Sequence, residues 1–212
     1  MTTPTVAAPP PSVAPPDSPP SSRPAAPTRR RFTVAEYYAM AEAGILAPDE
    51  RVELLDGDVI VMPPIGNWHA SNVDLFTNTF PAQLHGRAVV RVQNPVRLDG
   101  NSQPQPDVML LRWRDDFYRD GHPGPADVLL LIEVSDTTVD FDRNEKLAAY
   151  AAAGIPEVWI VNRPDRRIES YADPAGDEYA AVRHYDPGES ISPQAFPDVV
   201  LQVDQIIPPE TD

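Results

Sequence analysis

The chain of 212 residues contains no cysteine, only one lysine and no long apolar run. Without cysteine there can be no disulfide framework, no thiolate zinc site and no cysteine nucleophile. No apolar stretch approaches the roughly 20 residues that a membrane-spanning helix needs, and the N-terminus lacks the apolar core of a signal peptide. We therefore expect a soluble, cytoplasmic protein with no membrane partner.

Positive charge is also scarce, because 17 Lys and Arg stand against 32 Asp and Glu, for a formal net charge of −15. Binding to a nucleic-acid backbone is driven by Lys and Arg residues that release counterions from the phosphates. The acidic balance disfavours broad electrostatic binding of this kind. A role on nucleic acid has to depend on a local site.

The first 27 residues lack aromatic side chains and hydrophobic periodicity, and they hold 10 of the 27 prolines. Such a segment cannot bury enough apolar surface to offset the entropy lost on ordering. We expect a disordered Pro/Ala-rich tail over residues 1–31, a single domain over 32–207 and a short C-terminal tail over 208–212. The tail carries four arginines and Asp17, so its net charge of +3 leaves −18 on the remaining residues.

The N-terminal half of the domain predicts two helices and a hairpin. Thr33 and Glu36 form a capping-box pattern at the start of a helix over 33–43. Apolar runs at 52–55 and 59–62 flank an Asp-Gly turn, which is typical of a two-stranded hairpin. An apolar stripe from residue 68 to 84 predicts a second helix, interrupted or bent near Pro81.

The remaining pattern predicts an α/β fold. Strands are expected over 87–93, 106–112, 127–135, 157–161, 166–171 and 178–185, with a helix over 143–153 that Asp142 caps. The near-continuous apolar run at 127–135 indicates a central strand buried on both faces. The order of central strand, helix and strand indicates a parallel crossover. The class is therefore α/β, with a mixed central β-sheet flanked by helices on both sides.

Three acidic residues stand where an ionised side chain is costly. Glu133 follows the apolar run 128–132, Asp107 opens another such run, and Glu53 lies between two apolar residues. Burial of a carboxylate costs several kcal/mol unless a cation or hydrogen bonds compensate. Mg²⁺ would compensate, because it binds carboxylates together with water and phosphate oxygens. The alternative is that each acid points to solvent or caps a loop.

The single lysine, Lys146, stands out because the chain has 16 arginines. An ammonium is a compact charge whose pKa can shift, whereas a guanidinium is a planar fork. Lys146 falls near the start of the helix predicted over 143–153, within reach of the strand that carries Glu133. The alternative is a solvated helix lysine paired with Asp142 or Glu145.

Several strings of residues together carry a resemblance to a known family. They are Phe32-Thr33-Val34 with Glu36-Tyr37, Val52 to Gly57, Met62-Pro63-Pro64 with His69, Pro106-Asp107-Val108, Ile132 to Thr138, Asp140 to Asp142, Lys146, Tyr150 and Gly154 to Val161. In their order and spacing the chain resembles the Uma-two family of "putative restriction endonucleases". The resemblance covers about residues 32–207.

The resemblance implies a restriction-endonuclease-like PD-(D/E)XK fold with a four-stranded mixed central sheet and Mg²⁺-dependent hydrolysis of phosphodiester bonds. By position, Pro106-Asp107 matches the PD half-motif, and Glu133 matches the acid of the (D/E)XK half-motif. Ser135 stands where that half-motif usually has lysine. In the family a lysine on the following helix serves instead, and Lys146 matches it.

The implied catalytic set is Asp107, Glu133, Lys146, Glu53 and His69. Asp107 and Glu133 would hold Mg²⁺ or Mn²⁺, and Glu53 would complete the metal's shell or hold a second ion. Lys146 would steady the hydroxide or the developing charge. His69 would contact phosphate or act as an acid or base, although a histidine at a helix start is often structural. Glu53 and His69 are expected at the rim of the site.

We therefore expect a metal-dependent endonuclease whose partner is nucleic acid, with DNA favoured and RNA not distinguished, and we allow for a homodimer. The alternative is a catalytically silent protein with the nuclease fold that acts as an interaction or oligomerisation module, which the acidic charge favours. A glycosidase with two carboxylates is a weaker interpretation, because a lone lysine beside the pair is not part of that chemistry.

Overall fold

A computed structural model describes residues 28–209 of the chain. The helices are α1 (Val34–Glu42), α2 (Asn67–Leu84), α3 (Val139–Phe141), the π-helical turn η2 (Asp142–Lys146), α4 (Leu147–Ala152) and α5 (Val203–Ile206), with a 3₁₀ turn η1 (Pro125–Asp127). The strands are β1 (Val52–Leu55), β2 (Asp58–Val61), β3 (Ala88–Val92), β4 (Val108–Arg112), β5 (Val128–Ser135), β6 (Glu157–Asn162), β7 (Arg167–Ala175), β8 (Glu178–Tyr185), β9 (Ser190–Ile191) and β10 (Leu201–Gln202). Of the disordered tail predicted over residues 1–31, residues 1–27 lie outside the described residues, as do residues 210–212 of the predicted C-terminal tail, and the domain boundaries stay predictions.

Strands β3 to β8 form one mixed sheet in the order of the sequence. Only β5 and β6 are parallel, and the segment from α3 to α4 connects them, which confirms the predicted crossover. The sheet has the six strands that the residue pattern predicted, two more than the four-stranded sheet that the resemblance implied, because the hairpin of β7 and β8 adds to the free edge of β6. β5 lies inside the sheet and is almost wholly buried, as its apolar run predicted.

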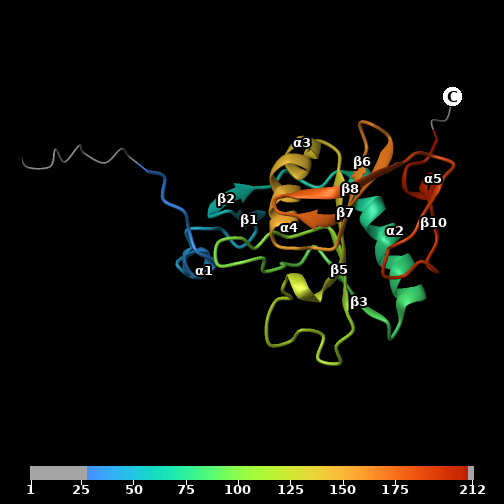
Figure 1. Cartoon of the computed structure of the whole chain (residues 1–212). Coiled ribbons are helices and arrows are strands. Elements are labelled where there is room, and N and C mark those ends of the chain that lie inside the picture. The colour runs from blue at the N-terminus through green and yellow to red at the C-terminus, as the bar shows by residue number, and fades with distance from the viewer. Residues whose placement is uncertain (1–27, 210–212) are drawn as a thin grey trace, which may run out of the picture.

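Helices cover both faces of this sheet (Figure 1). On one face α2 packs through Phe76, Phe80 and Leu84, together with α5 near the C-terminus. On the other face α4 packs through Tyr150 and Ala151. The predicted α/β class with helices on both sides of a mixed sheet is confirmed.

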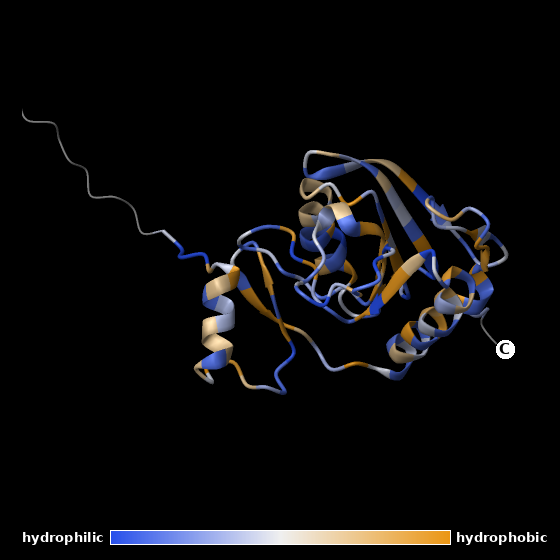
Figure 2. Ribbon diagram, turned by 90° about the horizontal axis from the view of Figure 1, so that it is seen from below, coloured by the Kyte–Doolittle hydropathy of each residue, from blue (hydrophilic) through white to orange (hydrophobic). Residues whose placement is uncertain are grey.

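The helix α1 and the hairpin of β1 and β2 form a small unit beside the main sheet (Figure 2). The capping box is present, since the Thr33 hydroxyl accepts from Glu36 N at 3.2 Å. Asp56 and Gly57 both have positive φ, as a tight two-residue hairpin turn requires. A hydrogen bond of 2.7 Å from Gln103 N to Leu54 O joins this unit to the main body.

Of two local predictions, one is wrong and one is only partly tested. The helix α2 is continuous through Pro81, so the predicted interruption is absent, whereas the alternative of a bend there stays a prediction. Phe80 and Leu84 are buried in the core, and their packing outweighs the backbone bond that proline loses. Asp142 does not cap a helix, because helical structure already begins at Val139 and Asp142 lies inside it. Within residues 28–209, no helix combines the length and apolarity needed to cross a bilayer.

Candidate active site

The register of β4 and β5 brings Asp107 and Glu133 together. Their antiparallel pairing sets Val108 opposite Ile132, so the residue before Val108 and the residue after Ile132 are neighbours across the strands. Side chains alternate along a strand, so Glu133 shares a face with Leu131, which packs on the α4 side of the sheet. Both acids are buried, which excludes the alternative of solvent-exposed carboxylates.

Asp142, Lys146 and Tyr150 follow at intervals of four residues and are all buried. Residues at this spacing share one face of a helix, and here that face lies against the sheet. The turn that carries Asp142 and Lys146 is π-helical, a form that occurs mostly as single turns and is frequent at functional sites. Ser135 and Thr138 hold Asp142 Oδ2 through their hydroxyls, at 2.8 and 2.6 Å.

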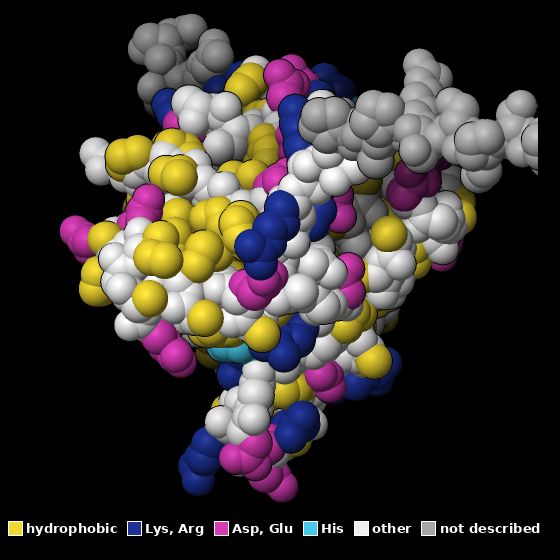
Figure 3. All heavy atoms as spheres, turned by 90° about the vertical axis from the view of Figure 1, so that its left-hand side faces the viewer, with side chains coloured by type: hydrophobic (Ala, Val, Ile, Leu, Met, Phe, Trp, Pro, Cys, Tyr) yellow, Lys and Arg dark blue, Asp and Glu magenta, His cyan; other side chains and the backbone are white. Residues whose placement is uncertain are grey.

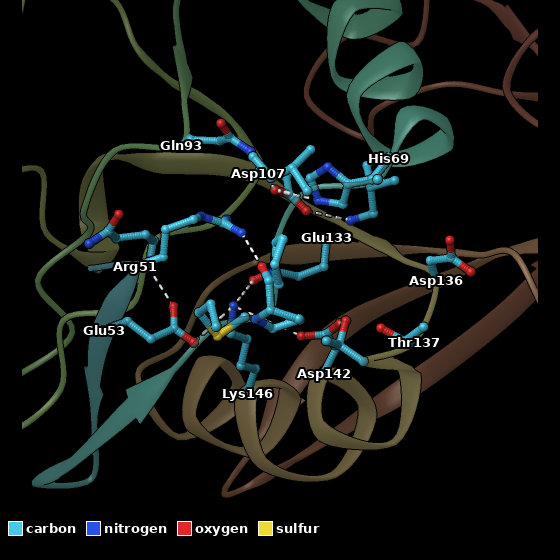
Figure 4. A pocket seen from close by; sticks show the side chains of 18 of the residues that line it. Arg51, Glu53, His69, Gln93, Asp107, Glu133, Asp136, Thr137, Asp142 and Lys146 are labelled. Atoms are coloured by element: carbon cyan, nitrogen blue, oxygen red, sulfur yellow. Dashed lines mark hydrogen bonds and ion pairs between the residues drawn. The ribbon is translucent and has the colours of Figure 1, made fainter. Parts of the chain in front are cut away.

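Lys146 is 2% exposed, and its ammonium is surrounded by carboxylates (Figure 4). Its Nζ lies 3.1 Å from Glu53 Oε1, 3.3 Å from Glu133 Oε1 and 3.9 Å from Asp142 Oδ1. The hydroxyl of Tyr150 donates to the same Glu133 Oε1 at 2.5 Å. The interpretation of Lys146 as a solvated helix lysine is therefore excluded.

Asp107 is held by three donors from three parts of the fold. Val134 N donates to Oδ2 at 2.8 Å, His69 Nε2 lies 2.9 Å from Oδ1, and Gln93 Nε2 donates to Oδ1 at 3.3 Å. Gln93 has a φ of 49°, and its backbone N–H donates to Asp107 O at 3.0 Å. Left-handed backbone at a residue other than glycine is costly and persists where the surroundings fix it.

These residues line one cavity of about 420 Å³. Glu53 enters it from β1 and is only 1% exposed, so it lies deep in the site rather than at the expected rim. Its Oε2 accepts from Gln105 N at 3.0 Å, so the small N-terminal unit supplies one wall. His69 lines the cavity from the first turn of α2. Arg51 lies on the wall beside Glu53 (Figure 4).

The burial of these groups sets their protonation. Burial raises the pKa of the Glu133 carboxyl, and the neighbouring carboxylates add to this effect while Lys146 opposes it. Burial by itself would lower the pKa of Lys146, but Glu133 and Glu53 outweigh it, so that pKa is raised and the ammonium stays charged at neutral pH. Burial and the Glu133 carboxylate raise the pKa of Tyr150, which keeps its proton to donate.

The donor set fits a hard divalent cation in its chemistry. Glu53, Asp107, Glu133 and Asp142 all line the cavity, and Lys146 is the ammonium that faces them. Carboxylate oxygens are preferred ligands of Mg²⁺ and Mn²⁺, and the excess of negative charge would be offset by such an ion. Among residues 28–209, no three His, Asp or Glu side chains already have the spacing of a metal site.

The structure thus brings all five residues of the predicted set into one cavity, while their catalytic roles stay predictions. Three further residues, Asp142, Tyr150 and Gln93, contact this set through polar side chains and were not predicted as site residues. The spacing of Asp142, Lys146 and Tyr150 could have indicated two of them. Nothing in the sequence marked Gln93, because its contact depends on the turn that follows β3.

Comparisons with known proteins agree with this geometry. The chain matches the Uma2 family, described as "Putative restriction endonuclease", over residues 34–204. It is similar to the crystal structure of "a putative nuclease belonging to DUF820" from Anabaena variabilis ATCC 29413, with a TM-score of 0.64 and 14% sequence identity. That similarity covers 83% of this chain and 97% of the other, and it shows a shared fold. No curated protein matches the chain. Because the family match spans most of the described residues, this protein is a member of the Uma2 family.

Proposed function

We propose that this protein is a metal-dependent endonuclease that hydrolyses phosphodiester bonds, with DNA as the favoured substrate. The observation that carries the proposal is the buried ammonium of Lys146, which contacts Glu53 and Glu133 in the cavity that also holds Asp107. Buried acids beside a fixed positive charge suit a reaction in which negative charge develops on a phosphoryl group. Membership of the Uma2 family supports the same reaction.

Asp107 and Glu133 are the residues that would hold Mg²⁺ or Mn²⁺. When bound, the ion supplies Lewis-acid polarisation of the phosphoryl group and activation of water. Val134 and Gln93 keep the Asp107 carboxylate oriented through their hydrogen bonds. His69 completes this set, so its first role is to hold Asp107 in place.

Lys146 acts as a fixed positive charge rather than as a base, because the surrounding carboxylates keep its proton bound. In the hydrolysis, the oxygen of a water molecule forms a bond to phosphorus as the water gives up a proton. The bond from phosphorus to one sugar oxygen breaks, and this sugar oxygen takes up a proton, so that no net proton is gained or lost. The ammonium stabilises the negative charge that develops on the phosphoryl oxygens. Arg51 is exposed and lines the cavity, so it is placed to meet a neighbouring phosphate of the strand.

The test is cleavage of plasmid and oligonucleotide DNA and of RNA with Mg²⁺ or Mn²⁺. Asp107→Asn and Glu133→Gln should each lower the rate by about 10²-fold or more and weaken metal binding measured by calorimetry. Glu145→Gln is the matched control, because Glu145 is exposed on the same helical turn as Lys146. Unchanged cleavage and metal binding in both site variants would show that the site is wrong.

One observation favours the alternative of an interaction module. Ile45 is 69% exposed and Val61 is 67% exposed, and hydrophobic side chains gather on the face that carries α1 and the β1–β2 hairpin (Figure 3). Exposed apolar patches mark surfaces for protein partners. Homodimer formation stays a prediction, which sedimentation of the full chain would test. A dimer that Val61→Glu disrupts, together with no cleavage of DNA or RNA, would favour this alternative.

A further inference from the structure

The carboxylates of the cavity divide into two groups that share Glu133. Asp107 is bonded by Val134, His69 and Gln93. Glu53 is bonded by Gln105 N at one oxygen and faces Lys146 at the other. Among these contacts, none of the three residues that bond Asp107 also bonds Glu53. We therefore group Glu53 with Lys146, its ion-pair partner.

Glu53 Oε1 is the clearest sign that the second group is built around a cation. This oxygen is buried and accepts no hydrogen bond. Its partner is the ammonium of Lys146 at 3.1 Å. A buried carboxylate oxygen without a hydrogen bond is costly, and a nearby positive charge is what offsets that cost.

Glu133 and Asp142 complete the surroundings of the same ammonium, at 3.3 and 3.9 Å. Glu133 Oε1 is occupied by Lys146 and Tyr150, which leaves Oε2 of Glu133 for a ligand from outside the chain. The three carboxylates therefore converge on one point, and the Nζ of the only lysine in the chain stands at that point.

We propose that the site takes one divalent cation, at Asp107 and Glu133, because the ammonium of Lys146 already occupies the position among Glu53, Glu133 and Asp142 that a second cation would take. Glu53 is then a partner of the lysine and not a ligand of the resident ion. The resident ion is that of the proposed function, on which this inference rests. Removal of the ammonium opens a second metal position.

The distances from Nζ to the three carboxylates explain why the second metal position does not exist while the ammonium is present. Oxygen ligands lie at about 2.0–2.1 Å from Mg²⁺, so the carboxylates that stand 3.1 to 3.9 Å from Nζ would have to close on the ion. Without the ammonium, three buried carboxylates repel one another, and a divalent ion would draw them together. Mn²⁺ is the suitable probe, because it takes the same oxygen ligands and is visible by electron paramagnetic resonance.

The experiment counts Mn²⁺ bound to the full chain at pH 8 by equilibrium dialysis, with electron paramagnetic resonance to detect coupling between adjacent ions. Wild type and Lys146→Arg should bind one Mn²⁺, and Lys146→Ala should bind two. The double variant Lys146→Ala with Glu53→Gln should return to one. Two ions on the wild type, or one ion on a folded Lys146→Ala variant, would overturn the inference.

Glu53→Gln in the wild-type background keeps the inference testable if Lys146→Ala does not fold. Because Glu53 is assigned to the lysine, this variant should still bind one Mn²⁺ with nearly unchanged affinity. A loss of Mn²⁺ affinity of about tenfold or more, as expected for a disturbed metal shell, would overturn the assignment of Glu53 to the lysine.

Failure of the inference can be told from failure of the proposed function. If the wild type binds one Mn²⁺ but cleaves no nucleic acid, the proposed function fails and this inference stands. If it cleaves and Lys146→Ala gains no ion, only the inference fails.

Discussion

Arg143 and Glu169 form an ion pair that ties the π-helical turn of the site to strand β7. Two nitrogens of the Arg143 guanidinium donate hydrogen bonds to the Glu169 carboxylate. Nε donates to Oε2 at 3.1 Å, and Nη2 donates to Oε1. Tyr171 OH and Asn162 Nδ2 donate to the same carboxylate, at 2.6 and 2.7 Å. Because Arg143 lies three residues before Lys146 on one turn, this pair holds the segment from which the lysine projects.

Arg143→Ala should destabilise the fold by about 3 kcal/mol, because it leaves a buried carboxylate without its cation. The Glu169 side chain is only 2% exposed, whereas that of Arg143 is 35% exposed, so we expect the lower end of the range for buried pairs. Urea denaturation measures the change. Arg119→Ala is the control, because Arg119 is exposed and should change stability by less than about 0.5 kcal/mol. Equal stability of the two variants would contradict this prediction.

The same pair predicts how the stability of the fold depends on pH. Burial raises the pKa of Glu169, but hydrogen bonds from Arg143, Tyr171 and Asn162 outweigh it, and the pKa lies below its usual value of 4.5. The unfolded state then binds the proton more readily than the folded state. The stabilisation is complete above about pH 4.5 and is lost as the pH falls through the lower folded value.

Glu169→Gln should therefore have a smaller fall in unfolding free energy below about pH 4.5 than the wild type. Denaturation curves between pH 3 and 7 compare the two proteins. Curves that stay parallel through the acid range would mean that Glu169 does not titrate with a lowered pKa.

The sequence predicted the parts of the fold that local chemistry determines. The capping box at Thr33, the Asp-Gly hairpin and the buried central strand each depend on residues close together in the chain, and each is present. The predicted interruption at Pro81 and the predicted cap at Asp142 both rested on a local signal that the surrounding contacts override. Burial of Phe80 carries the helix through Pro81, and hydroxyls from Ser135 and Thr138 bind the Asp142 carboxylate.

The site was predicted as a set of residues, with Lys146 in reach of the Glu133 strand, whereas its depth and its other internal contacts were not predicted. Asp107 and Glu133 could be anticipated because costly acids adjoin apolar runs. Glu53 was expected at the rim, since the sequence does not reveal that the β1 hairpin docks through Gln105. Contacts between residues far apart in the chain, such as that of Glu53 with Lys146, depend on the tertiary arrangement and have no local signature.

Tyr150→Phe tests a residue to which the sequence analysis gave no role in the site. Its hydroxyl donates to Glu133 Oε1 at 2.5 Å within a fully buried cluster. Loss of a hydrogen bond to a buried charged group costs about 1.5–3 kcal/mol, and we expect a destabilisation in that range. We also expect slower cleavage at saturating DNA, because Glu133 is less firmly held. Tyr185→Phe is the control, because Tyr185 is only half-buried and its hydroxyl makes no hydrogen bond to another residue of the described range 28–209. A Tyr150→Phe protein that matches this control in stability would contradict the prediction.

Truncation tests the predicted tail. A chain that starts at Thr28 should melt at the same temperature as the full chain, because residues 1–27 lack a core-forming pattern. A chain that starts at Val34 should melt lower, because it loses the ion pair of Arg31 with Asp58 and the packing of Phe32 against α1 and β1. Differential scanning calorimetry compares the three chains. A large drop for the first truncation would show that the tail contributes to the fold.

Lys146→Ala and Lys146→Arg test the central residue of the site. Loss of one fixed electrostatic donor lowers an enzymatic rate by about 10²–10³-fold, and we expect that loss for Lys146→Ala. Lys146→Arg should also be partly or wholly inactive, although it keeps the charge. The raised pKa of Lys146 keeps its ammonium protonated, so the loss of a proton transfer by Lys146 cannot be the reason. The planar guanidinium is instead too large for a position where three carboxylates lie 3.1 to 3.9 Å from a single nitrogen.

Single-turnover cleavage of DNA with Mg²⁺ or Mn²⁺ measures the loss of rate in both variants, after circular dichroism has shown that they are folded. Full activity of Lys146→Arg would mean that the site requires only a positive charge there and not the compact ammonium that its geometry encloses.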